Sequence, residues 1–247
     1  MNHLRLMTSA AIAALCVVLP HAGRVAANQG TPAASPEQRV AALKQNLAES
    51  QKRIRQYEWI ETTIVSLKGE EKARKQQRAY YGADGKLQKL PVGNEPQQQQ
   101  QQAGRGRGGR LKQKVVENKK EEMQDYMERA SNLIHMYVPP SPERIQSAKD
   151  AGRMAIRPGA QGRVTLEFSD YLLAGDRLNI DVDGAANRLL GLSVATYLDK
   201  PEDKVTLNVR MGSLSDGTGF TEQTTLEATA QNIRVVIQNS GHLPVAR

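Results

Sequence analysis

The feature that most constrains this chain is the alternation of apolar and polar side chains after residue 163. It is clearest in the stretches 164–169, 178–183 and 205–211, where every second residue is Val, Leu, Ile, Phe or Met. A period of two is typical of a β-strand with one buried and one solvated face. Further strands are expected at 189–198, 221–229 and 232–238. The C-terminal half is therefore predicted to be an antiparallel sheet that is covered on one face.

The N-terminal half combines helical and extended patterns. Apolar residues recur at helical spacing within 36–54 and 123–137, and a short helix is expected at 141–152. Three more strands are expected, at 57–67, 71–81 and 86–90. Together these patterns predict an α+β fold, in which a curved, partly closed antiparallel β-sheet of about eight or nine strands packs on helices.

Residues 91–112 interrupt this pattern. Six consecutive glutamines run into an Arg/Gly-rich segment, and Ala103 is the only aliphatic residue between Val92 and Leu111. Such a segment buries too little apolar surface to offset the entropy lost on ordering. We therefore predict one domain over residues 36–247, interrupted at 91–112 by a disordered loop.

The first 27 residues have the organisation of a secretory signal peptide. Arg5 supplies the positive charge, residues 10–19 form the apolar stretch, and small residues allow cleavage near Ala27. A linker at 28–35 follows. We expect a periplasmic or secreted protein.

This N-terminal segment has two alternative interpretations, an uncleaved membrane anchor and a site of lipid attachment. An uncleaved membrane anchor is less favoured, because its apolar stretch is shorter than the roughly 20 residues that span a bilayer. Lipid attachment at Cys16 is disfavoured because Leu15 is too large for the position before a lipidated cysteine. After processing, the chain is expected to have no transmembrane segment and no cysteine.

The positive charge of the chain is held unevenly. The net charge is +8, yet residues 163–247 contain eight bases and eleven acids, so the excess lies before them. Part of it is in the loop, at Arg105, Arg107 and Arg110, which either form a solvated spacer or contact an anionic lipid or envelope polymer. Nucleic acid is not an expected partner, since no aromatic residue for stacking occurs between 82 and 125.

No catalytic, metal-binding or cofactor-binding set is expected. His135 has no carboxylate nearby on its helix face, and His242 falls in a predicted tail. Asp181 and Asp183 share one strand face and could in principle serve hydrolysis, but their alternation with apolar residues favours a solvated face ahead of an Asp-Gly turn.

An apolar cavity is the sharper of two interpretations of the first strand. Tyr57, Trp59 and Val65 share one face of it, and aromatic residues on strands most often form ordinary core. The alternative is that they line a cavity beneath the second helix, whose stripe contributes Met123, Met127 and Ile134.

The stretches Tyr57 to Lys89 and Leu189 to Ser240 resemble a family of secreted bacterial proteins of uncharacterised function, and through it the periplasmic lipoprotein-carrier (Lol-type) fold. The resemblance rests on strands and turns, including SLSDGTGFTEQTTLEA and IRVVIQNSG. It implies an incompletely closed sheet that wraps helices and leaves a cavity for acyl chains. No cavity residue of the carriers can be carried over, because no residue motif matches.

These observations lead to an expected function. The chain is predicted to be an exported, non-enzymatic protein that binds a lipid-like ligand or a lipoprotein in a cavity between sheet and helix. The alternative is a structural or interaction protein of the envelope that uses a basic surface and has no ligand pocket. A hydrolase based on Asp181 and Asp183 is the third and weakest hypothesis.

Overall fold

The computed structural model describes residues 36–93 and 109–245, with side chains from 38 to 93 and from 121 to 245. Outside the described residues lie the predicted signal peptide (1–27), the predicted linker (28–35), Arg105 and Arg107, while Arg110 is described by its backbone only.

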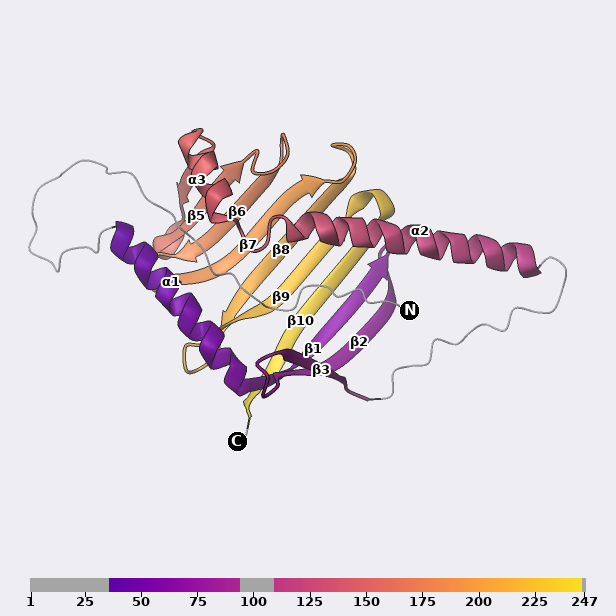
Figure 1. The fold of residues 1–247 in the computed structure, drawn as a ribbon, viewed down its shortest axis with the longest axis horizontal. Helices are drawn as coiled ribbons and strands as arrows, with labels where there is room; N and C mark the ends of the chain where they lie inside the picture. Colours follow the sequence, from indigo (N-terminus) through magenta and orange to yellow (C-terminus); the bar gives the residue numbers. More distant parts are fainter. Residues whose placement is uncertain (1–35, 94–108, 246–247) are drawn as a thin grey trace, which may run out of the picture.

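One antiparallel sheet organises the described chain (Figure 1). Its strands follow the order β3-β2-β1-β10-β9-β8-β7-β6-β5-β4, so the chain returns at its end to pair β10 with β1. The strands are β1 (Tyr57–Leu67), β2 (Glu70–Tyr81), β3 (Leu87–Pro91), β4 (Met154–Pro158), β5 (Arg163–Ser169), β6 (Arg177–Asp183), β7 (Arg188–Tyr197), β8 (Lys204–Ser213), β9 (Gly219–Ala228) and β10 (Ile233–Pro244).

The sheet differs from the prediction in two respects. It has ten strands in the described part of the chain, because β4 pairs with β5 although its sequence was too short to predict a strand. The sheet is also not closed, since β3 and β4 are separate edges. Both edge strands have five residues and end in proline, which lacks the N–H needed to extend a ladder.

Three α-helices accompany the sheet in the described chain: α1 (Pro36–Arg53), α2 (Gly109–His135) and α3 (Pro142–Asp150). Figure 1 shows α1 and α2 crossing the sheet near opposite ends of its strands, with α3 beside β5. Short 3-10 turns, η1 (Ile54–Gln56), η2 (Ala160–Gly162) and η3 (Thr229–Gln231), link some elements. None of the described helices is both long and apolar enough to span a membrane.

The start of α2 corrects the predicted loop boundary. Residues 109–112 were assigned to the disordered loop 91–112, but they form the first turn of the helix, and Pro91 belongs to β3. The segment has no apolar stripe, yet Arg, Lys, Gln and Leu all have high intrinsic helix propensity. Propensity therefore extends α2 well ahead of its first core residue.

A bulge lets β10 run further than predicted. The register between β1 and β10 shifts between Glu58 and Ile60, and Gly241 opposite has a positive φ of 64°. Glycine adopts this conformation without steric cost, which allows the strand to bend and continue. His242, predicted to lie in a tail, is therefore part of β10 and points to the helix-covered face.

The core lies between the sheet and the second half of α2. One face of the strands and the stripe of α2 form a single buried cluster, which reaches α3 through Ile145 and Ala148. On the sheet its members alternate as predicted, with Leu166 and Phe168 on β5 and Leu178 and Ile180 on β6. The cluster also includes Tyr137, just after α2, and five residues of that helix: Tyr126, Met127, Ala130, Leu133 and Ile134.

Candidate functional site

An open-sided cavity of about 880 Å³ lies between α1 and the helix-covered face of the sheet. Its floor is formed by β7, β8, β9, β10 and the start of β1. Apolar and aromatic side chains dominate this floor: Trp59, Leu189, Leu192, Val209, Met211 and Phe220. Such a volume is of the size that holds a small organic ligand.

The cavity exists because α1 does not fill the space beneath it. Leu43 is the buried apolar residue of α1, whereas Val40 and Leu47 are only half-buried. Further along the helix, Asn46, Ser50 and other short or polar residues face the sheet. These side chains cannot reach the strands with apolar atoms, so a void remains under the C-terminal half of α1.

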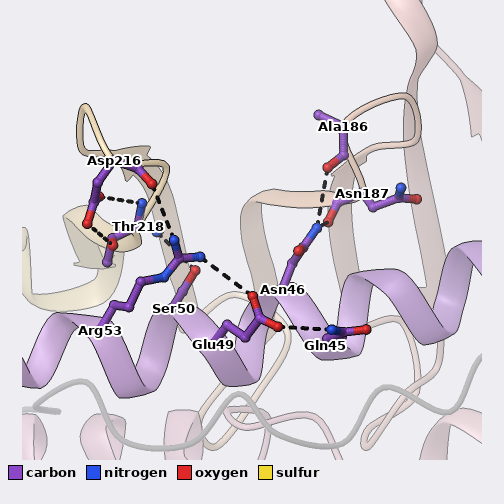
Figure 2. Close-up of polar contacts among 10 residues, drawn as sticks. Gln45, Asn46, Glu49, Ser50, Arg53, Ala186, Asn187, Asp216 and Thr218 are labelled. Atoms are coloured by element: carbon purple, nitrogen blue, oxygen red, sulfur yellow. Dashed lines mark hydrogen bonds and ion pairs between the residues drawn. The ribbon is translucent and has the colours of Figure 1, made fainter.

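Hydrogen bonds to hairpin turns hold α1 at the rim of the sheet (Figure 2). The Asn46 amide donates to the carbonyl oxygen of Asn187, at 2.9 Å, in the β6–β7 turn. Arg53 donates to the carbonyl of Asp216, at 3.3 Å, in the β8–β9 turn. Between them the hydroxyl of Ser50 accepts from the Gly219 N–H at 3.0 Å. The helix is thus fastened at the strand ends and spans the cavity between them.

Aromatic rings line the part of the floor that β1, β9 and β10 form. Trp59 is 4% exposed, and its indole N–H donates to Asn239 Oδ1 at 3.1 Å. The His242 ring stacks on Trp59 with centroids 5.7 Å apart and contacts Phe220 at 4.1 Å. Burial lowers the pKa of His242, so the neutral imidazole is favoured in the folded protein.

The charged groups at the cavity are of one sign. Arg53, Arg55, Lys86 and Arg188 line it, and none of the described lining residues is an Asp or Glu. Behind the rim, hydrogen bonds from Thr218 and Tyr57 and the charge of Arg53 lower the pKa of Asp216. That carboxylate therefore stays ionised and supports the turn that holds Arg53.

Of the six residues predicted to line an apolar cavity, Trp59 does so. Tyr57 instead donates its hydroxyl to Asp216 at the edge, and Val65 packs against the core further along β1. On α2, Met127 and Ile134 belong to the core cluster, and the partly buried Met123 packs against it. The cavity was predicted beneath α2, but the apolar side chains of α2 pack directly against the sheet and leave no room there. The cavity lies beneath α1 instead.

The other sequence candidates lie in different surroundings. His135 is exposed and borders the cavity together with Val138 and Pro139, without a carboxylate partner among the described residues. Asp181 and Asp183 lie on the sheet face opposite their core neighbours Ile180 and Val182. Asp183 accepts from the N–H groups of its own turn, and the pair faces away from the cavity.

Sequence reasoning missed most of the cavity. Leu47 and Ile54 were assigned to the ordinary apolar face of the first helix and His242 to a tail. Phe220 was assigned to no element, because the strand was predicted to begin at residue 221. A usable signal was the weak apolar stripe of α1, in which the spacing of Val40, Leu43 and Leu47 is not continued, because Ser50 and Gln51 follow at the next positions. The apolar and aromatic lining residues that the sequence did not predict as part of a cavity are Leu47, Ile54, Leu189, Leu192, Val209, Met211, Phe220 and His242.

No protein-family model matches the chain, and no curated protein matches it. The structure matches that of the LolA superfamily protein NE2245 from Nitrosomonas europaea, at 9% sequence identity and a TM-score of 0.34. The alignment covers 82% of this chain and 94% of that chain. The superfamily in the name of that protein is the Lol-type one that the strand and turn stretches of this chain resemble.

Proposed function

We propose that this protein is an exported, non-enzymatic binding protein that holds a lipid-like ligand, or the acyl chains of a lipoprotein, beneath α1. The observation that supports this proposal is the cavity of about 880 Å³ with an apolar and aromatic floor. A preformed apolar surface that is accessible from solvent gains free energy when a ligand with an apolar chain covers it. Met211 adds a flexible side chain that adapts to chains of different shape.

The chemistry of the lining favours binding over catalysis. No described lining carboxylate orients the imidazole ring of His135 or of His242. His242 is flanked by aromatic rings and not by a nucleophile. Export to the periplasm is proposed from the N-terminal signal sequence.

Trp59 provides a direct test, because it is the single tryptophan of the chain and it lines the cavity. Bromine quenches tryptophan fluorescence on contact, so a fatty acid brominated on its acyl chain should quench Trp59 in a saturable manner. The unbrominated acid should compete. Lipid extraction and mass spectrometry of protein purified from periplasm should in addition find a bound amphiphile.

Two adjacent threonines of β9 supply a matched pair of variants. Thr224 lines the cavity, whereas Thr225 points to the opposite face of the sheet. Thr224→Phe places a ring in the cavity and should abolish quenching, while Thr225→Phe should leave it unchanged. If neither protein nor variant shows saturable quenching and no amphiphile co-purifies, the proposal is wrong.

The alternative was an envelope protein without a ligand pocket, and the cavity argues against that version. Contact with an anionic envelope polymer through Arg105, Arg107 and Arg110 stays a separate proposal that is compatible with a carrier. It predicts that deletion of residues 97–110 lowers salt-sensitive retention on envelope fractions. Unchanged retention would reject it.

A further inference from the structure

The end of the cavity beside η1 has two cationic side chains that are not neutralised. Arg55 comes from η1 and Lys86 from the turn between β2 and β3, and both line the cavity. Neither forms a salt bridge with an acidic residue in the part of the chain that the structure describes. This end therefore carries net positive charge next to an apolar surface.

The position of the Arg55 guanidinium is well defined. Its central carbon lies 5.4 Å from the centroid of the Tyr81 ring, in a cation–π contact. Its Nη1 atom lies 3.4 Å from the position that a Cβ on Gly85 would take, so the guanidinium lies beside the β2–β3 turn. Lys86 follows Gly85 directly, which brings the second cation to the same end. The contact with the Tyr81 ring favours this position of the guanidinium before any ligand arrives.

The remaining cations of the cavity differ from this pair. Arg188, at the β6–β7 turn, lies 3.4 Å from Asp183, which offsets its charge. Arg53 is intermediate, because Glu49 is 3.8 Å away and one guanidinium nitrogen already donates to Asp216. However, the Nε atom of Arg53 is buried without a hydrogen-bond partner among the described residues, which leaves a donor to be satisfied.

Apolar surface begins directly beside these cations. Leu87 follows Lys86, Ile54 precedes Arg55, and Trp59 lines the adjoining floor. A ligand that fills the cavity from this end would place a polar group against the guanidinium and an apolar chain along the sheet. Carboxylate and phosphate groups match a guanidinium in shape and charge and form charge-assisted hydrogen bonds with it.

We propose that the cavity selects amphiphiles with an anionic headgroup, a carboxylate or a phosphate, and that Arg55 and Lys86 bind that headgroup. This inference rests on the proposed binding of a lipid-like ligand and adds the chemical class of the ligand. The aromatic and aliphatic floor takes the tail, and the cations near η1 set the orientation in which it enters.

The test compares ligands that share one oleoyl chain and differ in the headgroup. Oleate and oleoyl lysophosphatidate carry the two anionic groups, monooleoylglycerol is the neutral control, and inorganic phosphate is the free anion. Binding is followed by competition with the brominated acid at Trp59, below the aggregation concentration of each lipid. Both anionic lipids should bind about tenfold or more tightly than the neutral lipid, which corresponds to about 1.4 kcal/mol.

Charge removal at the two ends of the cavity locates the headgroup. The double variant Arg55→Gln with Lys86→Gln should lower the affinity for both anionic lipids by about tenfold and leave monooleoylglycerol unaffected. Arg188→Gln is the matched control, since it removes a cation that lines the cavity but is paired with Asp183. Arg55 and Lys86 are exposed, so the double variant should fold normally, which circular dichroism verifies.

The outcomes separate this inference from the proposed function. Equal affinity for anionic and neutral lipids, or equal losses in the double variant and in Arg188→Gln, would overturn the headgroup site while the carrier function stands. Absence of binding by all three lipids would overturn both. Binding of inorganic phosphate alone, abolished in the double variant, would show a free-anion site and reject the amphiphile.

Discussion

The helices α1 and α2 cross the same sheet, but they meet it with different side chains. In the second half of α2, five residues are buried in the core: Tyr126, Met127, Ala130, Leu133 and Ile134. In α1 the buried core residue is Leu43, and the polar Asn46 and Ser50 face the strands further along. The space between α2 and the sheet is therefore filled with side chains (the packed region), whereas the space between α1 and the sheet contains the cavity (the hollow region).

The polar contacts of the two regions also differ in burial. Near the end of α2, the Tyr137 hydroxyl bonds with Asp176 and with Thr196, and all three residues are buried. Burial and the bond to Asp176 raise the pKa of Tyr137. Asp176 also accepts from the N–H groups of Tyr171, Leu172 and Leu173. A carboxylate is tolerated there because each of its oxygens has donors.

The hydrogen bonds from α1 to the strand ends come from its second half, and the one between Arg53 and Asp216 is exposed to water. Exposed hydrogen bonds and ion pairs contribute little to stability, because water competes for the same groups. The helix α1 is therefore positioned over the sheet by its hydrogen bonds to the turns without filling the space below it, and a void remains there.

The largest expected difference between the two regions is in the free energy of unfolding that is lost when a leucine is replaced by alanine. Leu133→Ala on α2 deletes buried atoms from the packed region and should lower the free energy of unfolding by about 2–5 kcal/mol. Leu47→Ala on α1 removes a half-buried side chain beside an existing void and should cost less than about 1 kcal/mol. Urea unfolding followed by circular dichroism measures both. Equal costs would contradict the division into a packed and a hollow region.

A smaller difference is expected for two tyrosine hydroxyls. Tyr137→Phe removes a donor from the buried Asp176 and should lower the free energy of unfolding by about 1–3 kcal/mol. Tyr57→Phe removes the corresponding bond to Asp216 at the exposed rim and should leave stability within experimental error. The pair is measured in the same urea experiment. A destabilising Tyr57→Phe would mean that the rim contacts hold α1 more firmly than their exposure indicates.

The smallest expected effect is the pH dependence that His242 adds to the hollow region. Its pKa is lowered by burial from 6.5, so below about pH 6.5 the unfolded chain binds a proton that the folded chain binds only at lower pH. Stability should therefore fall as the pH drops through this range. In His242→Gln that part of the pH dependence should disappear, as measured by urea midpoints at several pH values.

His135→Gln is the matched control for this measurement, since His135 is exposed at the other end of the cavity. It should leave the pH dependence of the urea midpoint as it is in the parent protein. If His135→Gln flattened the dependence as much as His242→Gln did, the burial of His242 between Trp59 and Phe220 would not be its cause.

The strands were the most predictable part of the molecule. Residues such as Leu166, Phe168, Leu178 and Ile180 lie on the buried face that their alternation predicts, because a strand has only two faces. β4 was not predicted, since five residues that end in Pro158 carry no usable period and pair only because β5 offers an edge. The stripe of α2 was also predicted, but its role was not, because a period identifies a buried face and not the density of packing beneath it.

The sequence by itself determined the strand faces, the helix stripes and the uneven charge of the chain. Each of these depends on the spacing of residues along one element, which local backbone geometry fixes. Only the tertiary structure decided where the cavity lies, since that depends on how far α1 and α2 stand from the sheet. It also decided that Arg55 and Lys86 share one end of the cavity and that His242 stacks on Trp59. These neighbours are distant in sequence, and contacts of that kind follow from the pairing of β1 with β10 and of β1 with β2.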